Sequence, residues 1–87
     1  MRKISDQLRR KGWYLFRNKK VKVDLITPRR IYFKVEGETE EHSVVYDREL
    51  NEWSCDCKYW SLKFKWCSHI YACWLWLRDK GLIKPKQ

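Results

Sequence analysis

The sequence predicts an α+β fold: a small antiparallel β-sheet, preceded by an N-terminal helix and followed by a C-terminal helix. Two kinds of periodicity predict it. Short runs of β-branched and aromatic residues fill the middle of the chain, with turn residues between them. Apolar residues recur at helical spacing near both ends. At 87 residues the chain has room for one domain, residues 1–87, with a thin core.

The N-terminal helix is expected to begin at Ser5 or Asp6, either of which can cap it, and to end near Asn18. Gly12 lies inside this helix and costs about 1 kcal/mol relative to alanine, so both a continuous helix and a break at Gly12 stay open. Four apolar residues form its predicted inner side: Ile4, Leu8, Leu15 and Phe16.

Four strand-like runs follow this helix and predict the sheet. They cover residues 21–26, 31–35, 43–46 and 52–55. Pro28 fixes its own backbone angle and predicts a turn between the first two runs. The last two runs are joined by a short loop that carries Asp and Asn, which is typical of a β-hairpin.

The C-terminal helix is the clearest element. Its apolar stripe recurs at i, i+3, i+4 and i+7: Ile70, Cys73, Trp74 and Leu77. Ser68 is expected to cap its start, and Gly81 is expected to adopt a left-handed conformation at its end. Tyr71, Leu75 and Trp76 fall on the other side, which predicts burial on two faces. Either the N-terminal helix or a partner subunit is expected to cover this second face.

Two ligand pairs with the same spacing point to a metal. Cys55-Asp56-Cys57 is followed, after nine residues, by Cys67-Ser68-His69. The N-terminus lacks the apolar stretch of a signal peptide, so we expect an intracellular protein with reduced thiols rather than two disulfides. Three thiolates and one imidazole complete a tetrahedral zinc site. The pattern predicts one structural Zn²⁺ held by Cys55, Cys57, Cys67 and His69, tying the hairpin to the final helix.

Two nearby residues are weighed against these ligands. Cys73 lies four residues after His69, on the same helix face, and competes for the fourth ligand position. Its place in the apolar stripe favours a buried thiol instead. His42 stands beside an acidic run and is expected to be solvated rather than to be a ligand. With four ligands the zinc has no open position for water, so the chain is not expected to be an enzyme.

The C-x-C-x9-C-x-H pattern, after a hairpin and running into a helix, resembles the SWIM zinc finger. The resemblance covers residues 42–80, with residues 4–36 as an N-terminal helix and strand extension. It implies a ββα arrangement, zinc bound by the four residues above, and a role in DNA binding or protein–protein contacts in DNA-processing proteins. Members often carry Pro, Pro and Lys where Lys58, Trp66 and Ser68 stand. None of these is a ligand, so the departures bear on local turn geometry.

Charge suggests a polyanionic partner, because the net charge is +9. Residues 1–34 carry twelve basic and two acidic residues, whereas residues 35–54 carry one and seven. This division predicts a molecule with a positive and a negative side. No apolar run is long enough to cross a membrane, so no membrane partner is expected.

The segment between the ligand pairs interleaves lysines with aromatic residues, which suits contact with phosphates and bases. Its alternation also predicts a strand with one buried face, on which Trp60 and Trp66 are expected to lie. We expect nucleic-acid binding, to DNA rather than RNA, mainly through backbone contacts of weak sequence selectivity. The expected contact residues are Lys58, Tyr59, Lys63, Lys65, Arg9, Arg10, Lys19, Lys20, Arg29 and Arg30.

The alternative is a zinc-stapled adaptor, or a subunit of a DNA-processing complex, that docks a protein or a second copy of itself through Tyr71, Leu75 and Trp76. Exposure of these residues would favour that alternative. If the N-terminal helix covers these residues instead, nucleic-acid binding through the basic surface is favoured.

Overall fold

A computed structural model describes residues 5–37, 40–63 and 66–82. The elements are α1 (Asp6–Arg17), β1 (Val21–Ile26), β2 (Arg30–Glu36), β3 (Glu41–Asp47), β4 (Glu52–Cys55), α2 (Lys58–Lys63) and α3 (Ser68–Asp79). The α+β class is confirmed: in chain order, the four strands of the sheet follow an N-terminal helix and precede a C-terminal helix. The short helix α2 differs from the prediction, because the interleaved segment was expected to be a strand.

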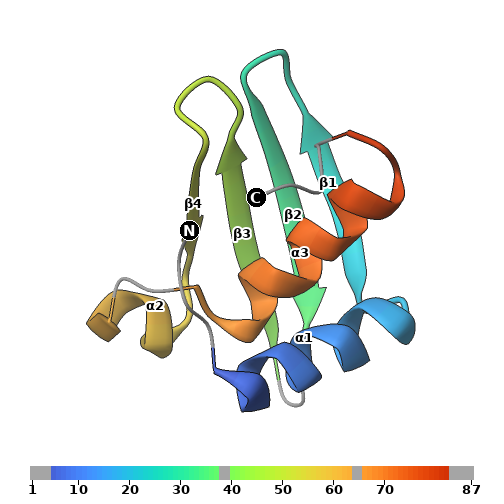
Figure 1. Ribbon diagram of the computed structural model, residues 1–87. Coiled ribbons are helices and arrows are strands. Elements are labelled where there is room, and N and C mark those ends of the chain that lie inside the picture. Colours follow the sequence, from blue (N-terminus) through green and yellow to red (C-terminus); the bar gives the residue numbers. More distant parts are fainter. Residues whose placement is uncertain (1–4, 38–39, 64–65, 83–87) are drawn as a thin grey trace.

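The sheet is a simple meander with strand order β1-β2-β3-β4, and each neighbouring pair is antiparallel (Figure 1). β1 departs from strict alternation, because its register with β2 shifts between Val23 and Leu25. Leu25 and Ile26 beyond this irregularity are exposed. The β3–β4 pair forms the predicted hairpin, with Asn51 in its turn at a positive φ of 54°.

Helix α3 covers one face of the sheet and makes the core with it (Figure 1). Alternate residues of β2 point at the helix and are almost fully buried: Ile31, Phe33 and Val35. From α3, Ile70 and Leu77 have no exposed surface. Removing this apolar surface from water is the main force that holds helix and sheet together.

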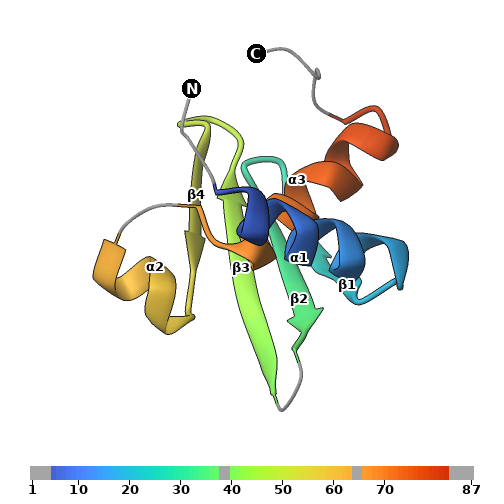
Figure 2. The ribbon, with the colours of Figure 1, turned by 60° about the horizontal axis from the view of Figure 1, so that its bottom comes forward.

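Helix α1 packs against α3 rather than on the sheet (Figure 2). As predicted, Ser5 caps it, and its Oγ accepts a hydrogen bond from the Leu8 N–H at 3.2 Å. Of the two alternatives at Gly12, the continuous helix is the one found, since α1 runs through this residue without a break. A Cβ at Gly12 would lie only 2.6 Å from Cδ2 of Tyr71 and 3.1 Å from the Ser68 carbonyl oxygen. The glycine therefore permits a close helix crossing. Ile4 lies outside the described residues.

Helix α3 begins differently from the prediction. Cys67 occupies the N-cap position, and Ser68 is a buried residue of the helix itself. Gly81 adopts the expected left-handed conformation, with φ of 73°. The second face of α3 is largely covered within the chain: Leu75 is buried, and Tyr71 lies under Gly12 of α1. In the part of the chain that the structure describes, no helix is long and apolar enough to cross a membrane.

The acidic residues do not form one side of the molecule, because the strand β3 carries them to both ends of the sheet. Glu36 and Glu41 face each other where β2 ends and β3 begins. Asp47 and Glu52 pair at the opposite end. The predicted separation into a positive and a negative side is therefore wrong.

Candidate metal centre

The four predicted ligands come from three neighbouring parts of the chain and converge on one point. Cys55 ends β4, and Cys57 directly precedes α2. Cys67 caps α3 and His69 lies in its first turn. The four ligand atoms all lie within 4.8 Å of one another. The site therefore joins the β3–β4 hairpin to the helix that covers the sheet.

The distances between these atoms fit zinc. The Nδ1 atom of His69 is 3.6 Å from Cys67 Sγ and 3.8 Å from Cys55 Sγ. Zinc–sulfur bonds of about 2.3 Å place tetrahedral ligand atoms roughly 3.8 Å apart. The three cysteines are buried, with at most 7% of their surface exposed. Such a donor set, enclosed and complete, is that of a structural zinc site, and His69 is oriented to bind through Nδ1.

The environment of the cysteines favours a thiolate at one position. A hydrogen bond from Cys55, assisted by His69, lowers the pKa of Cys67 to about 4, although burial acts against it. The same hydrogen bond, together with burial, raises the pKa of Cys55. Zinc binds the thiolate form, so Cys67 offers a ready ligand while Cys55 and Cys57 must release protons when the metal binds.

His42 lies beside the metal centre, so its expected solvation is wrong. Its side chain is only 18% exposed, and its ring centre is 4.3 Å from that of His69. Its Nδ1 lies 3.1 Å from Oδ1 of Asp56, which also accepts a hydrogen bond from the Ser43 N–H. Asp56 thus ties the Cys-Asp-Cys segment to the start of β3. The hairpin register would have predicted this, because it pairs Val44 with Cys55 and so carries His42 toward Cys57.

Cys73 does not belong to the ligand cluster found among the described residues. It is completely buried in the core, and burial raises the pKa of its thiol well above the usual value. This agrees with the interpretation of Cys73 as a small apolar residue of the α3 stripe.

A Cys₃His cluster with buried cysteines and a partly buried histidine, which joins a β-hairpin to a helix, defines a small structural zinc-finger module built around one zinc ion. Residues 33–72 match the SWIM zinc finger family. The matched segment contains all four ligands, and α1 and β1 precede it. Comparison with curated proteins and with solved structures found no match.

The residues predicted to contact nucleic acid lie in three separate places, as far as the structure describes them. Arg9 and Arg10 are exposed on α1, and Lys19 and Lys20 follow that helix. A second group, on α2, contains Lys58, Tyr59 and Lys63. Lys65 lies outside the described residues. Arg29 and Arg30 lie by the β1–β2 turn, at the end of the sheet opposite to α1 (Figure 1).

Several of these cations already have acidic partners. Arg29 Nε lies 3.2 Å from Asp47 Oδ2, and its Nη1 lies 3.3 Å from Glu49 Oε1. Arg30 Nε lies 3.5 Å from the same Asp47 oxygen. Lys20 pairs with Glu36 at 3.4 Å. The arginine pair by the turn therefore has a structural role, which leaves α1 as the stronger basic surface.

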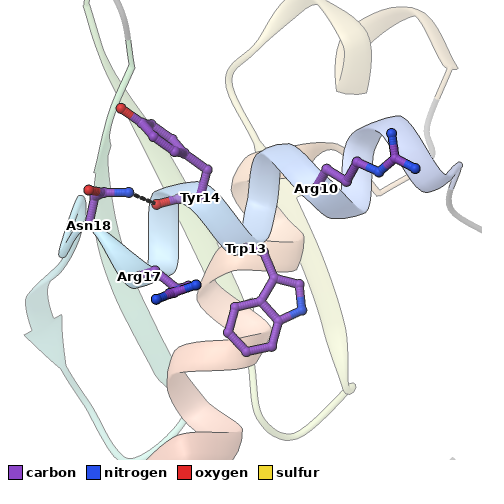
Figure 3. Close-up of a pocket in the computed structure, with 5 residues that line it drawn as sticks. All are labelled: Arg10, Trp13, Tyr14, Arg17 and Asn18. Atoms are coloured by element: carbon purple, nitrogen blue, oxygen red, sulfur yellow. Dashed lines mark hydrogen bonds between the residues drawn. The ribbon is translucent and has the colours of Figure 1, made fainter.

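Sequence reasoning missed two exposed aromatic residues on that surface. Trp13 and Tyr14 of α1 are 46% and 61% exposed, and they line a hollow with Arg10, Arg17 and Asn18 (Figure 3). Helical numbering contained the signal, because positions 10, 13, 14 and 17 form one stripe. The segment between the ligand pairs agrees only in part with its predicted burial. Trp60 and Trp66, which were expected to be buried, are half-buried, and Leu62 is 76% exposed.

Proposed function

We propose that this SWIM zinc finger protein binds nucleic acid through the outward face of α1, mainly by contacts with phosphates. One observation carries the proposal: α1 has four basic residues and one acidic residue, and its opposite side packs against α3. The basic residues are Arg9, Arg10, Lys11 and Arg17. A one-sided cationic helix attracts a polyanion and holds it away from the core.

Weak sequence selectivity is part of the proposal. Helix α3, the last helix of the metal centre, is not free to enter a groove and read base edges, since it is covered on both faces. Arginines and lysines on a surface helix supply phosphate contacts, which position a protein without reading sequence. DNA is the expected partner and RNA the comparison. The zinc holds the scaffold and takes no part in a reaction, so we propose a non-catalytic role.

The packing of α1 supports this choice over the protein-docking alternative. That alternative uses the second face of α3, where Leu75 is buried and Tyr71 contacts Gly12. Trp76 packs edge-on against Phe33, with ring centres 5.8 Å apart. A partner would have to displace α1 to reach most of this face.

Binding to duplex DNA measured over a range of salt concentrations tests the proposal. The logarithm of the affinity should fall linearly with the logarithm of salt concentration, by about 0.9 for each phosphate contact. Arg9→Glu with Arg10→Glu should lower the affinity and reduce the slope by about two. Lys58→Glu with Lys63→Glu changes the net charge equally on α2 and serves as the matched control.

The outcomes separate clearly. A larger loss from the α1 variant than from the α2 variant supports the proposed surface. Absent binding, or binding that does not depend on salt, contradicts phosphate-dominated binding of duplex DNA. Equal losses from both variants contradict the assignment to α1, because they report overall charge rather than a site.

A further inference from the structure

The outward stripe of α1 combines aromatic rings with arginines. Its members recur at i, i+3, i+4, i+7 and i+8, and they line a hollow of about 490 Å³ (Figure 3): Arg10, Trp13, Tyr14, Arg17 and Asn18. Phosphate contacts alone account for the arginines. They do not account for two large rings placed in water between them.

We propose that this stripe binds single-stranded nucleic acid, with unpaired bases stacked on Trp13 and Tyr14 and the backbone held by Arg10 and Arg17. The inference rests on the proposed function and narrows it to a class of nucleic acid. Both DNA and RNA single strands offer this chemistry, because the base rings and the phosphates are common to them.

The exposure of the two rings is the first step. The aromatic residues of the sheet are buried, with Phe33 at 1% and Trp53 at 8% exposure. Trp13 and Tyr14 are instead the aromatic members of the exposed large apolar residues in the described part of the chain. Trp13 touches Phe16 edge-on, with ring centres 5.7 Å apart. The core therefore does not require the outer faces of these rings.

The direction of the rings is the second step. Trp13 and Tyr14 project from α1 in different directions, so neither ring covers the other (Figure 3). Asn18 uses its side-chain amide to donate a hydrogen bond to the Tyr14 carbonyl oxygen at 2.8 Å, which closes the end of the helix. The residue that carries one of the rings is thus held in a regular helical turn.

The charge beside the rings is the third step. Neither Arg10 nor Arg17 forms an ion pair with another residue that the structure describes, in contrast to Arg29 at the far turn. Cations beside exposed rings favour a polyanion over an apolar protein surface, because burying them against apolar groups costs their hydration. This charge complementarity selects nucleic acid as the occupant.

The accessibility of the bases decides whether a single strand or a duplex fits this surface better. In a duplex the bases stack on each other, and a convex surface helix meets the phosphates first. In a single strand the bases are free to turn outward and stack on protein rings, which contributes about 1–3 kcal/mol for each base. The rings thus add affinity for single strands that a duplex does not gain.

The test compares three probes of equal length: a labelled oligothymidine, its uridine RNA counterpart, and a DNA duplex. Trp13→Ala with Tyr14→Ala should weaken single-strand binding about 10-fold to 100-fold, which corresponds to the loss of one or two stacked bases. Duplex binding should change less than about threefold, because the phosphate contacts remain. The DNA and RNA probes show which single strand the site prefers.

Matched variants keep the result interpretable. Trp13→Phe with Tyr14→Phe retains flat rings and should retain most single-strand affinity. Leu62→Ala removes an even more exposed apolar residue from α2 and should leave all three affinities unchanged. Each variant should still bind one zinc ion and keep its melting temperature, since the replaced side chains lie largely outside the core.

The possible failures are distinguishable. If the unmodified protein binds none of the probes, the proposed function itself fails. A second outcome is that the unmodified protein binds the probes in a salt-dependent way, but the alanine variant loses the same affinity for single strands and duplex, or loses none for either. The stacking inference is then overturned, and the phosphate-binding surface stands.

Discussion

The two ends of the β3–β4 hairpin are held by different chemistry. At one end, Cys55 and Cys57 meet Cys67 and His69 of the final helix in a metal cluster. At the other end, Asp47 is the main organiser of the turn. Its Oδ1 accepts hydrogen bonds from the N–H groups of Glu49 and Leu50, both at 3.0 Å, and its carboxylate pairs with the arginines of the β1–β2 turn.

This contrast explains why the two ends of the hairpin have different roles in stability. The backbone hydrogen bonds at the Asp47 end close a local turn between residues two or three positions apart, which costs little chain entropy. The ion pairs of Asp47 reach more distant residues, but Arg29 and Arg30 are half-exposed, so each pair contributes little. The metal end connects a strand to a helix more than ten residues later and fixes the layer that covers the sheet. A small domain with a thin core gains most from a strong connection between distant segments. The metal end should therefore determine whether the chain folds, and the turn end should only adjust its stability.

Removing a zinc ligand should have the largest effect. Apparent zinc-binding energies of about 10–16 kcal/mol exceed or equal the total stability of most domains, about 5–15 kcal/mol. Cys67→Ala, or excess chelator, should therefore unfold the chain, as circular dichroism and zinc analysis would show. Cys73→Ala is the control: it should retain one zinc ion with a modest loss of stability. Zinc lost from the Cys73 variant and retained by the Cys67 variant would contradict the ligand assignment.

Gly12→Ala should have the next largest effect on stability. Alanine usually stabilises a helix by about 1 kcal/mol relative to glycine. Here its Cβ would press on Tyr71 and on the Ser68 carbonyl, beside two zinc ligands, and such overpacking costs about 1–3 kcal/mol. We expect a net loss of stability in chemical denaturation, together with weaker zinc binding. Lys11→Ala on the exposed side should be nearly neutral. A raised melting temperature for Gly12→Ala would show that the crossing is not close.

The sequence predicted the fold well where local patterns determine it. The four strands, both terminal helices and the ligand set follow from periodicity and spacing that lie within short segments. Errors and open alternatives arose where a distant contact decides. Gly12 remains helical because α3 crosses it, and propensity alone does not contain that contact. The segment after Cys57 alternates like a strand, yet it forms α2 between two ligand pairs that are held together.

The functional site was likewise predictable where it depends on local patterns and not where it depends on distant contacts. Cys-x-Cys and Cys-x-His are local patterns, so the metal ligands were predictable. His42 was not, since it reaches the site through the register of β3 with β4 and through Asp56. The aromatic stripe of α1 was overlooked for another reason. Trp13 and Tyr14 are apolar residues, and composition alone gives no sign that they face water.

His42→Gln should have a smaller effect, confined to the metal end. Loss of the ring against His69 frees that ligand to rotate, and residues that surround metal ligands commonly change affinity by about tenfold or more. Competition with a chromogenic chelator would measure the change at constant pH. Glu41→Gln, the exposed neighbour on the same strand, should bind zinc normally. Equal affinities for the two variants would reduce His42 to a packing residue.

Asp47→Asn should have the smallest effect and should leave zinc affinity unchanged. Hydrogen bonds from the Leu50 N–H and from Arg29, joined by the Glu49 N–H, hold the pKa of Asp47 below its usual value. A depressed pKa means that the carboxylate stabilises the fold above the pKa of the unfolded chain, and that this contribution is lost as pH falls through the folded pKa. The variant should therefore melt a few degrees lower near neutral pH, and the two curves should converge in acid.

Glu52→Gln is the matched control for this end, because Glu52 pairs with Asp47 across the ladder and is exposed. It should melt like the unmodified protein at every pH. If Asp47→Asn weakened zinc binding as well, the hairpin would be transmitting strain along β4 to Cys55, and the two ends would have to be treated as one cooperative unit. An unchanged zinc affinity, with a pH-dependent fall in melting temperature, would show that the turn adjusts stability locally while the metal fixes the fold.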